Sequence, residues 1–188
     1  MSQYIAHILN INADSINVYE QTNSKSSMFN ISSIAELNIL NESDSLLVLI
    51  PSSTVTSYEF EENKSLSKQI NIANFISEVD STFADPVSNN DYFLHNNAAY
   101  VVDKFFLKNL NVSLSELNTK IYVSPEYLIN VVEGNDVITE FEGRFMISYS
   151  NKTGFALDHN SLSQYIEIVL NKNPNFNPLI FSTNKDLL

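Results

Sequence analysis

Residues 65–103 read SLSKQINIANFISEVDSTFADPVSNNDYFLHNNAAYVVD, and this stretch organises the rest of the chain. Its first half predicts an amphipathic helix over Ser65–Phe83, because apolar residues recur there at steps of three and four. Glu78 and Asp80 fall away from this apolar stripe and are expected to face water. The expected inward stripe consists of Leu66, Ile70, Ala73, Ile76, Val79 and Phe83.

The second half of the stretch predicts a β-hairpin that leads into another helix. Two short apolar runs, Tyr92–His95 and Ala98–Asp103, are joined by Asn96-Asn97, residue types that tolerate the positive φ of a tight turn. Asp103 stands where an N-cap is expected, ahead of an amphipathic helix over Lys104–Leu117. We expect this helix-hairpin-helix unit to be a docking scaffold.

The segments before this unit predict a sheet with one deeply buried strand. Three short strands of an antiparallel meander are expected over Tyr4–Asn12, Ser15–Glu20 and Ser27–Ile31. Ser32–Leu37 offers a serine cap and about two helical turns. Ser45–Ile50 is apolar throughout, as a strand buried on both faces is. Val55–Glu61 alternates as a half-buried strand with a charged side.

The last third of the chain predicts hairpins and one more helix. Lys120–Val123 is expected as a strand, and Val131–Val132 is expected to pair with Val137–Phe141 across a turn. The three glycines are placed at turns with a left-handed backbone. Further strands are expected at Arg144–Tyr149, Gly154–Asp158 and Leu179–Phe181, with a helix from Asp158 or Asn160 to Asn171 between the last two.

Composition limits the class of protein. The chain of 188 residues carries a net charge of −12, which argues against binding to nucleic acid or anionic lipid and favours a basic protein partner. It has no cysteine, so disulfide and thiolate chemistry are excluded. No signal peptide and no membrane-spanning run are recognisable, and we expect a soluble cytoplasmic protein.

The sequence offers no pattern typical of a catalytic or cofactor site. A phosphate loop usually needs clustered glycines, and the three glycines here are isolated. The first hairpin, Leu9–Asn17, lacks glycine altogether. His7, His95 and His159 have no metal-ligand spacing and are expected to be surface or hairpin residues. Catalytic residues, metal ligands and cofactors are therefore predicted to be absent.

The order of segments resembles the cytoplasmic domain of type II secretion system protein L. The similarity runs from about Ser45 to Leu170, while residues 1–42 match only in their meander pattern. Tryptophan, common in that family, is absent here. The matching pieces are residues 46–51 with the alternating strand after them, the helix through Glu78 leading to Phe93–His95, Tyr100–Lys104, Ser124–Glu126, Phe141–Ile147 and Thr153–Asp158.

The resemblance implies an α+β fold of actin-like or ribonuclease-H-like lobes that has lost its nucleotide site. Mixed sheets of short strands and a few amphipathic helices are expected. Residues 1–125 would form the first lobe, with the helix-hairpin-helix unit inserted, and residues 126–188 a second, truncated β-rich lobe with one helix. The family continues into a transmembrane helix and a periplasmic domain, so this chain resembles a soluble fragment from the cytoplasmic face of the inner membrane.

The resemblance also implies a role and its partners. The domain would recruit the secretion ATPase to the membrane through that enzyme's N-terminal domain, beside other inner-membrane platform proteins and with a homodimer as a further assembly. The docking candidates are Glu59 and Glu61 on the alternating strand and Glu78 and Asp80 on the helix. For each acid taken alone, a role in solubility accounts for its presence equally well.

Two other functions stay open at this point. A divergent actin-like ATPase of the pilus-assembly type would be stabilised by ATP, by about 2.7 kcal/mol at 100 times its dissociation constant. An extracellular β-rich binding domain is suggested by the asparagine and serine content. A hydrophobic segment of about 20 residues after Leu188 would exclude the extracellular binding domain.

Overall fold

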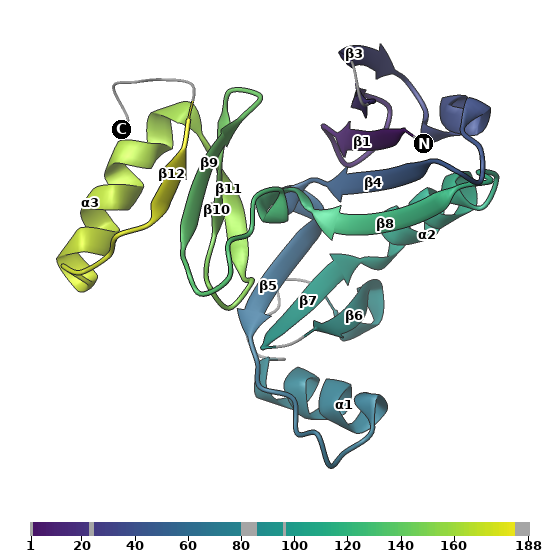
Figure 1. The fold of residues 1–188 in the computed structure, drawn as a ribbon. Coiled ribbons are helices and arrows are strands. Elements are labelled where there is room, and N and C mark those ends of the chain that lie inside the picture. The colour runs from purple at the N-terminus through teal and green to yellow at the C-terminus, as the bar shows by residue number, and fades with distance from the viewer. Residues whose placement is uncertain (1, 23–24, 80–85, 96, 183–188) are drawn as a thin grey trace.

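The computed structural model describes residues 2–22, 25–79, 86–95 and 97–182. It shows a mixed α+β fold, in which three sheets of short strands are accompanied by a few helices, as the sequence predicted (Figure 1). No helix of the described residues is long and apolar enough to cross a membrane.

The largest sheet has five strands. Its order is β3-β2-β1-β4-β8. β2 pairs antiparallel with both β1 and β3, and β4 pairs parallel with both β1 and β8. The predicted meander and the buried fourth strand are confirmed, although the first strand ends at Ile8. The strands are β1 (Gln3–Ile8), β2 (Ile16–Gln21), β3 (Ser26–Ile31), β4 (Ser45–Ile50) and β8 (Lys120–Pro125).

Two helices bury one face of this sheet. The 3-10 helix η1 (Ile34–Ile39) begins at Ser33, whose side chain and Glu36 form a capping box. The helix α2 (Lys104–Leu114) begins after Asp103, whose carboxylate accepts the backbone N–H of Phe106 at 2.6 Å, so the predicted cap is confirmed. The main core joins the sheet to η1 and α2 through Ala6, Ile8, Val18, Leu37, Leu46, Val48, Phe106, Leu110 and Leu114.

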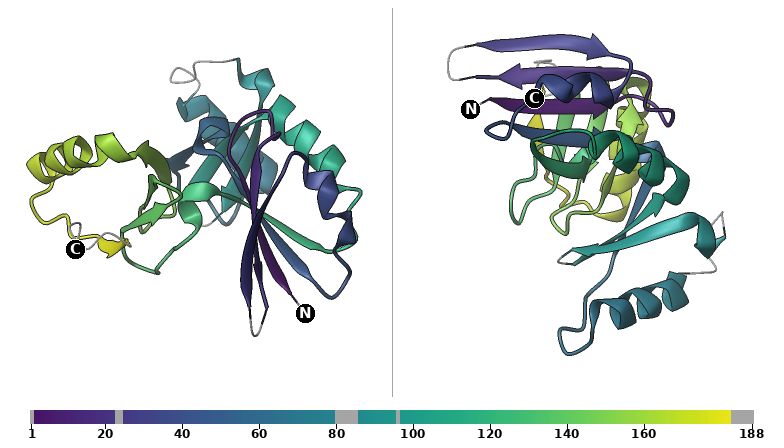
Figure 2. Two further views of the ribbon diagram at one scale, coloured as in Figure 1. Left: turned by 90° about the horizontal axis from the view of Figure 1, so that it is seen from above. Right: turned by 90° about the vertical axis from the view of Figure 1, so that its right-hand side faces the viewer.

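A second layer, made of a three-stranded sheet and α1, projects away from the first sheet (Figures 1 and 2). The predicted hairpin is present, with β6 (Asn90–His95) antiparallel to β7 (Ala98–Asp103), and β5 (Val55–Glu59) pairs with the other edge of β7. Of the predicted hairpin turn, Asn96 lies outside the described residues. The two faces of this sheet differ, because Tyr100 and Val102 of β7 belong to the main core and Ala99 and Val101 to a separate cluster under α1.

The helix α1 (Lys68–Val79) begins three residues later than predicted, and the predicted inward stripe is partly right, because Ile76 and Val79 pack against the aromatic cluster of the sheet. Phe75 is 1% exposed and meets the rings of Tyr58 and Phe60 at centroid distances of 5.5 and 5.3 Å. Ile70, predicted to face inward, is 48% exposed. The aromatic side chains of the sheet pack against the face of α1 that carries Phe75. Leu66 and Ala73 are also exposed, and the predicted Phe83 lies outside the described residues.

The third sheet has the order β11-β10-β9-β12, and α3 (Leu162–Lys172) packs on it. Val131–Val132 is not a strand, so the hairpin predicted around Gly134 is wrong: β9 pairs with β10 and β12 instead. The proposed division at residue 125 stays a prediction. The strands are β9 (Val137–Phe141), β10 (Arg144–Ser148), β11 (Gly154–Asp158) and β12 (Leu179–Phe181).

One glycine differs from the sequence-based prediction. Gly134 and Gly143 have φ of 74° and 73°, as predicted, but Gly154 does not adopt the left-handed conformation. A Cβ at Gly154 would lie 2.1 Å from the backbone oxygen of Ile147 and 2.7 Å from the ring of Tyr127. Close packing of β10 and β11 therefore explains this glycine. The remaining short 3-10 helices are η2 (Ser52–Thr54), η4 (Val87–Asn89), η5 (Glu126–Leu128) and η6 (His159–Ser161).

Candidate functional site

A cluster of charged side chains lies where the five-stranded sheet meets β9 and β10. His7 comes from β1, on the face opposite Ala6 and Ile8, because side chains alternate along a strand. Glu126 begins η5 directly after β8, and Arg144 begins β10. His7 and Glu126 are 1% and 0% exposed, so their charges have to be satisfied inside the protein.

Glu126 is the centre of one half of the cluster. Its Oε2 lies 2.8 Å from Nε2 of His7, and both of its oxygens accept from Nη1 of Arg144, at 3.1 and 3.2 Å. Its Oε1 also accepts the backbone N–H of Ser52 at 2.7 Å. This carboxylate therefore ties together β1, the start of η2 and β10.

Glu142, in the turn between β9 and β10, is the centre of the other half. Its Oε2 lies 2.6 Å from Nδ1 of His7. Its Oε1 accepts from the side-chain amide of Asn17 at 2.7 Å and from the hydroxyl of Tyr19. These two donor residues of β2 thus reach across to the third sheet.

The protonation states follow from these contacts. Burial by itself lowers the pKa of His7, but the hydrogen bonds to Glu126 and Glu142 outweigh burial and raise the pKa to about 9. Burial raises the pKa of Glu126, yet the hydrogen bonds from His7 and Ser52 hold that pKa below its usual value. The pKa of Glu142 is lowered in the same way. At neutral pH the His7 ring is therefore a cation that donates through both nitrogens.

This arrangement suits a structural junction. The two carboxylates are occupied by donors from His7, Arg144 and their neighbours, so neither is left as a free base. Within the described part of the chain, no group of three or more His, Asp or Glu could hold a metal ion.

The sequence-based prediction for His7 was wrong. It was expected at the surface or in a hairpin, and it is buried between two carboxylates that lie 119 and 135 positions away in the sequence. Neither composition nor spacing carries a signal for such distant partners.

The loop between β1 and β2, where an actin-like ATPase would bind phosphate, bonds to itself. The backbone N–H of Leu9 donates to the oxygen of Ser15 at 2.9 Å, and that of Ala13 donates to the oxygen of Asn10 at 3.1 Å. Asp14 accepts from the side-chain amide of Asn10 at 2.8 Å. A hollow of about 290 Å³ separates this loop from α2. The absence of nucleotide binding stays a prediction.

Three of the four predicted docking residues lie in the described part of the chain, in the layer built from the three-stranded sheet and α1. Glu59 ends β5, Glu61 follows it, and Glu78 lies in the last turn of α1. All three are exposed, as predicted for Glu78, and their side chains form no hydrogen bond or ion pair with another described residue. The structure brings none of them into mutual contact, and Asp80 lies outside the described residues.

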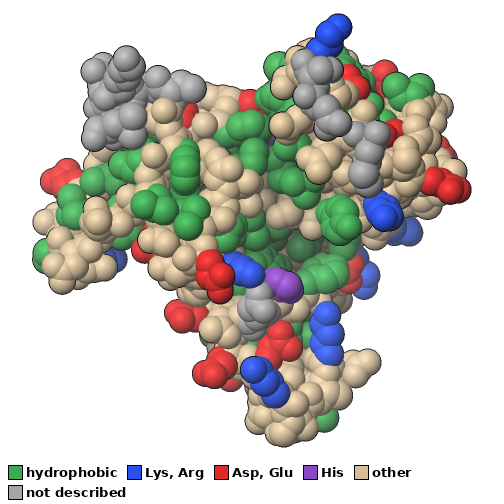
Figure 3. Space-filling view, in the orientation of Figure 1, with side chains coloured by type: hydrophobic (Ala, Val, Ile, Leu, Met, Phe, Trp, Pro, Cys, Tyr) green, Lys and Arg blue, Asp and Glu red, His purple; other side chains and the backbone are tan. Residues whose placement is uncertain are grey.

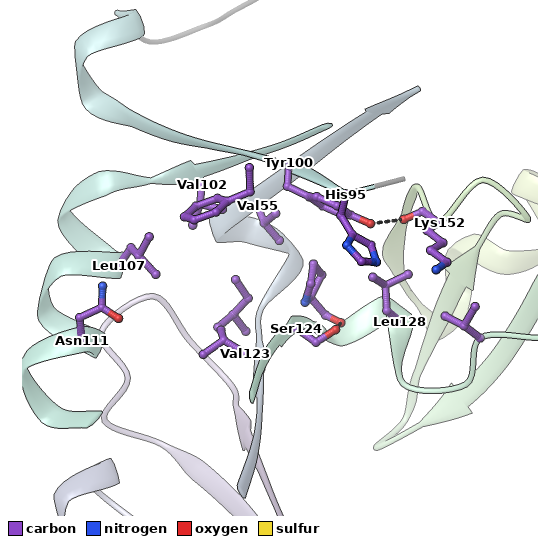
Figure 4. A pocket seen from close by; sticks show the side chains of 14 residues that line it. Val55, His95, Tyr100, Val102, Leu107, Asn111, Val123, Ser124, Leu128 and Lys152 are labelled. Atoms are coloured by element: carbon purple, nitrogen blue, oxygen red, sulfur yellow. Dashed lines mark hydrogen bonds between the residues drawn. The ribbon is translucent and has the colours of Figure 1, made fainter. Parts of the chain in front are cut away.

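Sequence reasoning missed an apolar hollow of about 620 Å³ below β8. It opens near the centre of the face seen in Figure 3, where hydrophobic side chains line it. Figure 4 shows His95 and Lys152 at one end of it and Leu107 and Asn111 at the other. The lining residues are Ile50, Val55, Phe93, His95, Tyr100, Val102, Leu107, Asn111, Val123, Ser124, Pro125, Leu128, Val131 and Lys152.

Comparisons with known proteins find a likeness among solved structures but none among sequences. No protein-family model matches the chain, and no curated protein sequence matches it. Among solved structures, the chain is similar to the cytoplasmic domain of EpsL, an inner membrane component of the type II secretion system of Vibrio cholerae. The TM-score is 0.70 at 15% sequence identity, over 96% of this chain and 81% of that one. The resemblance noted in the sequence is thus confirmed at the level of the fold.

Proposed function

We propose that this chain is a non-catalytic docking domain of a type II secretion inner-membrane platform. Its role would be to recruit the secretion ATPase, through the N-terminal domain of that enzyme, to the cytoplasmic face of the inner membrane. The observation that carries the proposal is the likeness of fold, with a TM-score of 0.70 over 96% of the chain, to a cytoplasmic domain of such a platform.

The topology of the first sheet supports the actin-like part of the proposal. The order β3-β2-β1-β4-β8 combines an antiparallel meander with two parallel additions, and helices cover the main core. Actin-like and ribonuclease-H-like lobes share this arrangement, although a fold by itself does not assign a function.

The first loop supports a role without catalysis. A phosphate-binding loop presents free backbone N–H groups to its ligand. The amides of Leu9 and Ala13 are instead bonded to carbonyl groups of the same loop.

The exposed acids Glu59, Glu61 and Glu78 are the proposed contact points for the ATPase. They have no partner within the described chain, so their charges are available to a basic surface. Other platform proteins and a second copy of this chain are further proposed partners.

Isothermal titration calorimetry with the N-terminal domain of the secretion ATPase from the same genome tests the proposal. We expect binding at low salt that weakens as salt is added, because exposed charges are screened. A triple variant, Glu59→Lys, Glu61→Lys and Glu78→Lys, should weaken binding by roughly fivefold or more, since each exposed pair contributes up to about 1 kcal/mol.

The matched control is a second triple variant, Glu116→Lys, Glu133→Lys and Glu167→Lys, at exposed acids outside the α1 layer. It changes the net charge by the same amount but should leave the affinity within about twofold. No binding at low salt would refute the recruiting role. Equal losses of affinity for this control and for the variant of Glu59, Glu61 and Glu78 would show that the ATPase does not contact those three acids.

A further inference from the structure

The apolar hollow runs along a free sheet edge. β8 pairs with β4 on one side, in parallel register from Ser45↔Lys120 to Ile50↔Pro125. Among the described residues, no strand pairs with the other side of β8. A strand with one unpaired side presents a row of backbone N–H and C=O groups that can accept a further strand.

The opposite wall is one face of the three-stranded sheet. Tyr92 and Leu94 of β6 face α1, so the alternating residues Phe93 and His95 face the hollow. Phe93 is 42% exposed. The hydroxyl of Tyr100 donates to the backbone oxygen of Lys152 at 3.0 Å, which leaves the tyrosine ring as an apolar floor (Figure 4).

The charged side chains that line this hollow and the one adjoining it are mostly basic. Lys152 and His95 lie at one end of it. At the other end it shares Asn111 with an adjoining hollow that is lined by Lys104 and Lys108. Among the described residues, Asp91 is the one carboxylate in either lining. Lysines therefore predominate around this site, on a chain whose net charge is −12.

We propose that this groove binds an extended segment of a partner protein in which apolar and acidic residues alternate, added as a strand along the free edge of β8. The backbone edge supplies the hydrogen bonds, the hollow takes every second side chain, and the lysines pair with the acids. A six-residue strand such as β8 offers an edge of about 20 Å. This site is independent of the proposed ATPase contact, which is acidic and calls for a basic partner.

The test uses three fluorescein-labelled peptides and the whole chain. The first has the alternating sequence Glu-Val-Glu-Ile-Glu-Val, the second replaces each Glu by Lys, and the third replaces the central Ile by Pro. We expect saturable binding of the first peptide in fluorescence anisotropy and at least tenfold weaker binding of the other two. In an amide NMR spectrum, the first peptide should shift the signals of residues 121–124.

Variants of the protein show whether the lysines that border the groove recognise the acidic side chains. Lys108→Glu with Lys152→Glu should weaken binding of the acidic peptide about tenfold, because two attractions become repulsions. The control, Lys64→Glu with Lys68→Glu, makes the same charge change near the start of α1 and should have little effect. The proposal is overturned if the lysine peptide binds equally well or if the β8 amides do not shift. It is also overturned if the chain forms a dimer that buries this groove, which would make a second copy the occupant.

Discussion

His7 holds together three parts of the chain that are distant in sequence. Its ring bridges Glu126 and Glu142, at 2.8 and 2.6 Å, and Arg144 completes the pairing with Glu126. Breaking a buried charge cluster by removing one partner is costly, because the remaining charges stay in a place where water does not reach them. Substitutions of these residues should therefore lower the free energy of unfolding far more than substitutions of exposed charged residues.

Replacement of Glu126 by alanine tests the junction directly. Glu126→Ala leaves His7 without one carboxylate and the Ser52 N–H without its acceptor, so we expect a loss of about 3–5 kcal/mol in the free energy of unfolding. Asp158→Ala is the control, because Asp158 is 86% exposed and lies 3.8 Å from Arg144. It should cost less than about 1 kcal/mol. Similar urea midpoints for the two variants would contradict the role of the junction.

The pH dependence of stability provides a second measurement. The pKa of His7 is about 9 in the folded state against 6.5 ordinarily, so its contribution is complete below pH 6.5 and is lost as the pH rises through 9. The full loss corresponds to about 3 kcal/mol. Urea unfolding measured from pH 6 to pH 10 should show this decline in the wild type and a flatter curve in His7→Gln. Parallel curves for the two proteins would exclude His7 as the titrating group.

At the scale of elements, α1 shows how tertiary packing selects a helix face. Asn71 is 3% exposed although it is polar, because its side chain accepts the backbone N–H of Asn63 at 2.9 Å and donates to the oxygen of Asn63 at 3.0 Å. Phe75, one turn further on, enters the aromatic cluster of the sheet. A buried polar residue one turn before a buried ring interrupts the apolar period in the sequence, which explains why the predicted stripe contained Ile76 and Val79 but missed Asn71 and Phe75.

A pair of alanine substitutions separates the observed face of α1 from the predicted one. Phe75→Ala should cost about 3–5 kcal/mol, because it removes a buried ring and leaves a cavity. Ile70→Ala should cost less than about 1 kcal/mol, since Ile70 is 48% exposed. Chemical denaturation followed by circular dichroism gives both values. A larger loss for Ile70→Ala would restore the stripe predicted from the sequence.

At the scale of the whole molecule, two regions of the surface differ in charge and polarity. The layer of α1 and β5 exposes Glu59, Glu61 and Glu78, whereas the groove below β8 is apolar and bordered by lysines. Two surfaces of opposite charge suit a domain that contacts more than one partner.

The proposed loss of nucleotide binding has a consequence for the intact domain. Because the amides of Leu9, Ala13 and Asp14 are bonded within the first loop, we expect that magnesium and ATP do not raise the melting temperature. A true ligand at 100 times its dissociation constant would add about 2.7 kcal/mol, which a thermal shift assay detects easily. Magnesium with ADP is measured in parallel. A rise in melting temperature with either nucleotide would favour the ATPase alternative.

The sequence by itself determined the elements whose signals are local. The meander of β1 to β3, the apolar β4, the Asp103 cap and the β6–β7 hairpin each depend on neighbouring residues, and each is present in the structure. The exposure of Glu59, Glu61 and Glu78 was also predictable, because charged residues remain in water unless a partner compensates them.

Only the tertiary structure decided the burial of His7, the face of α1, the pairing of β9 with β12 and the groove below β8. Each of these depends on groups that the fold brings together from distant positions, such as His7 with Glu142, 135 positions apart. Free energies of burial and ion pairing depend on the neighbours in space. A pattern along the chain does not show which distant residues become neighbours in the folded protein.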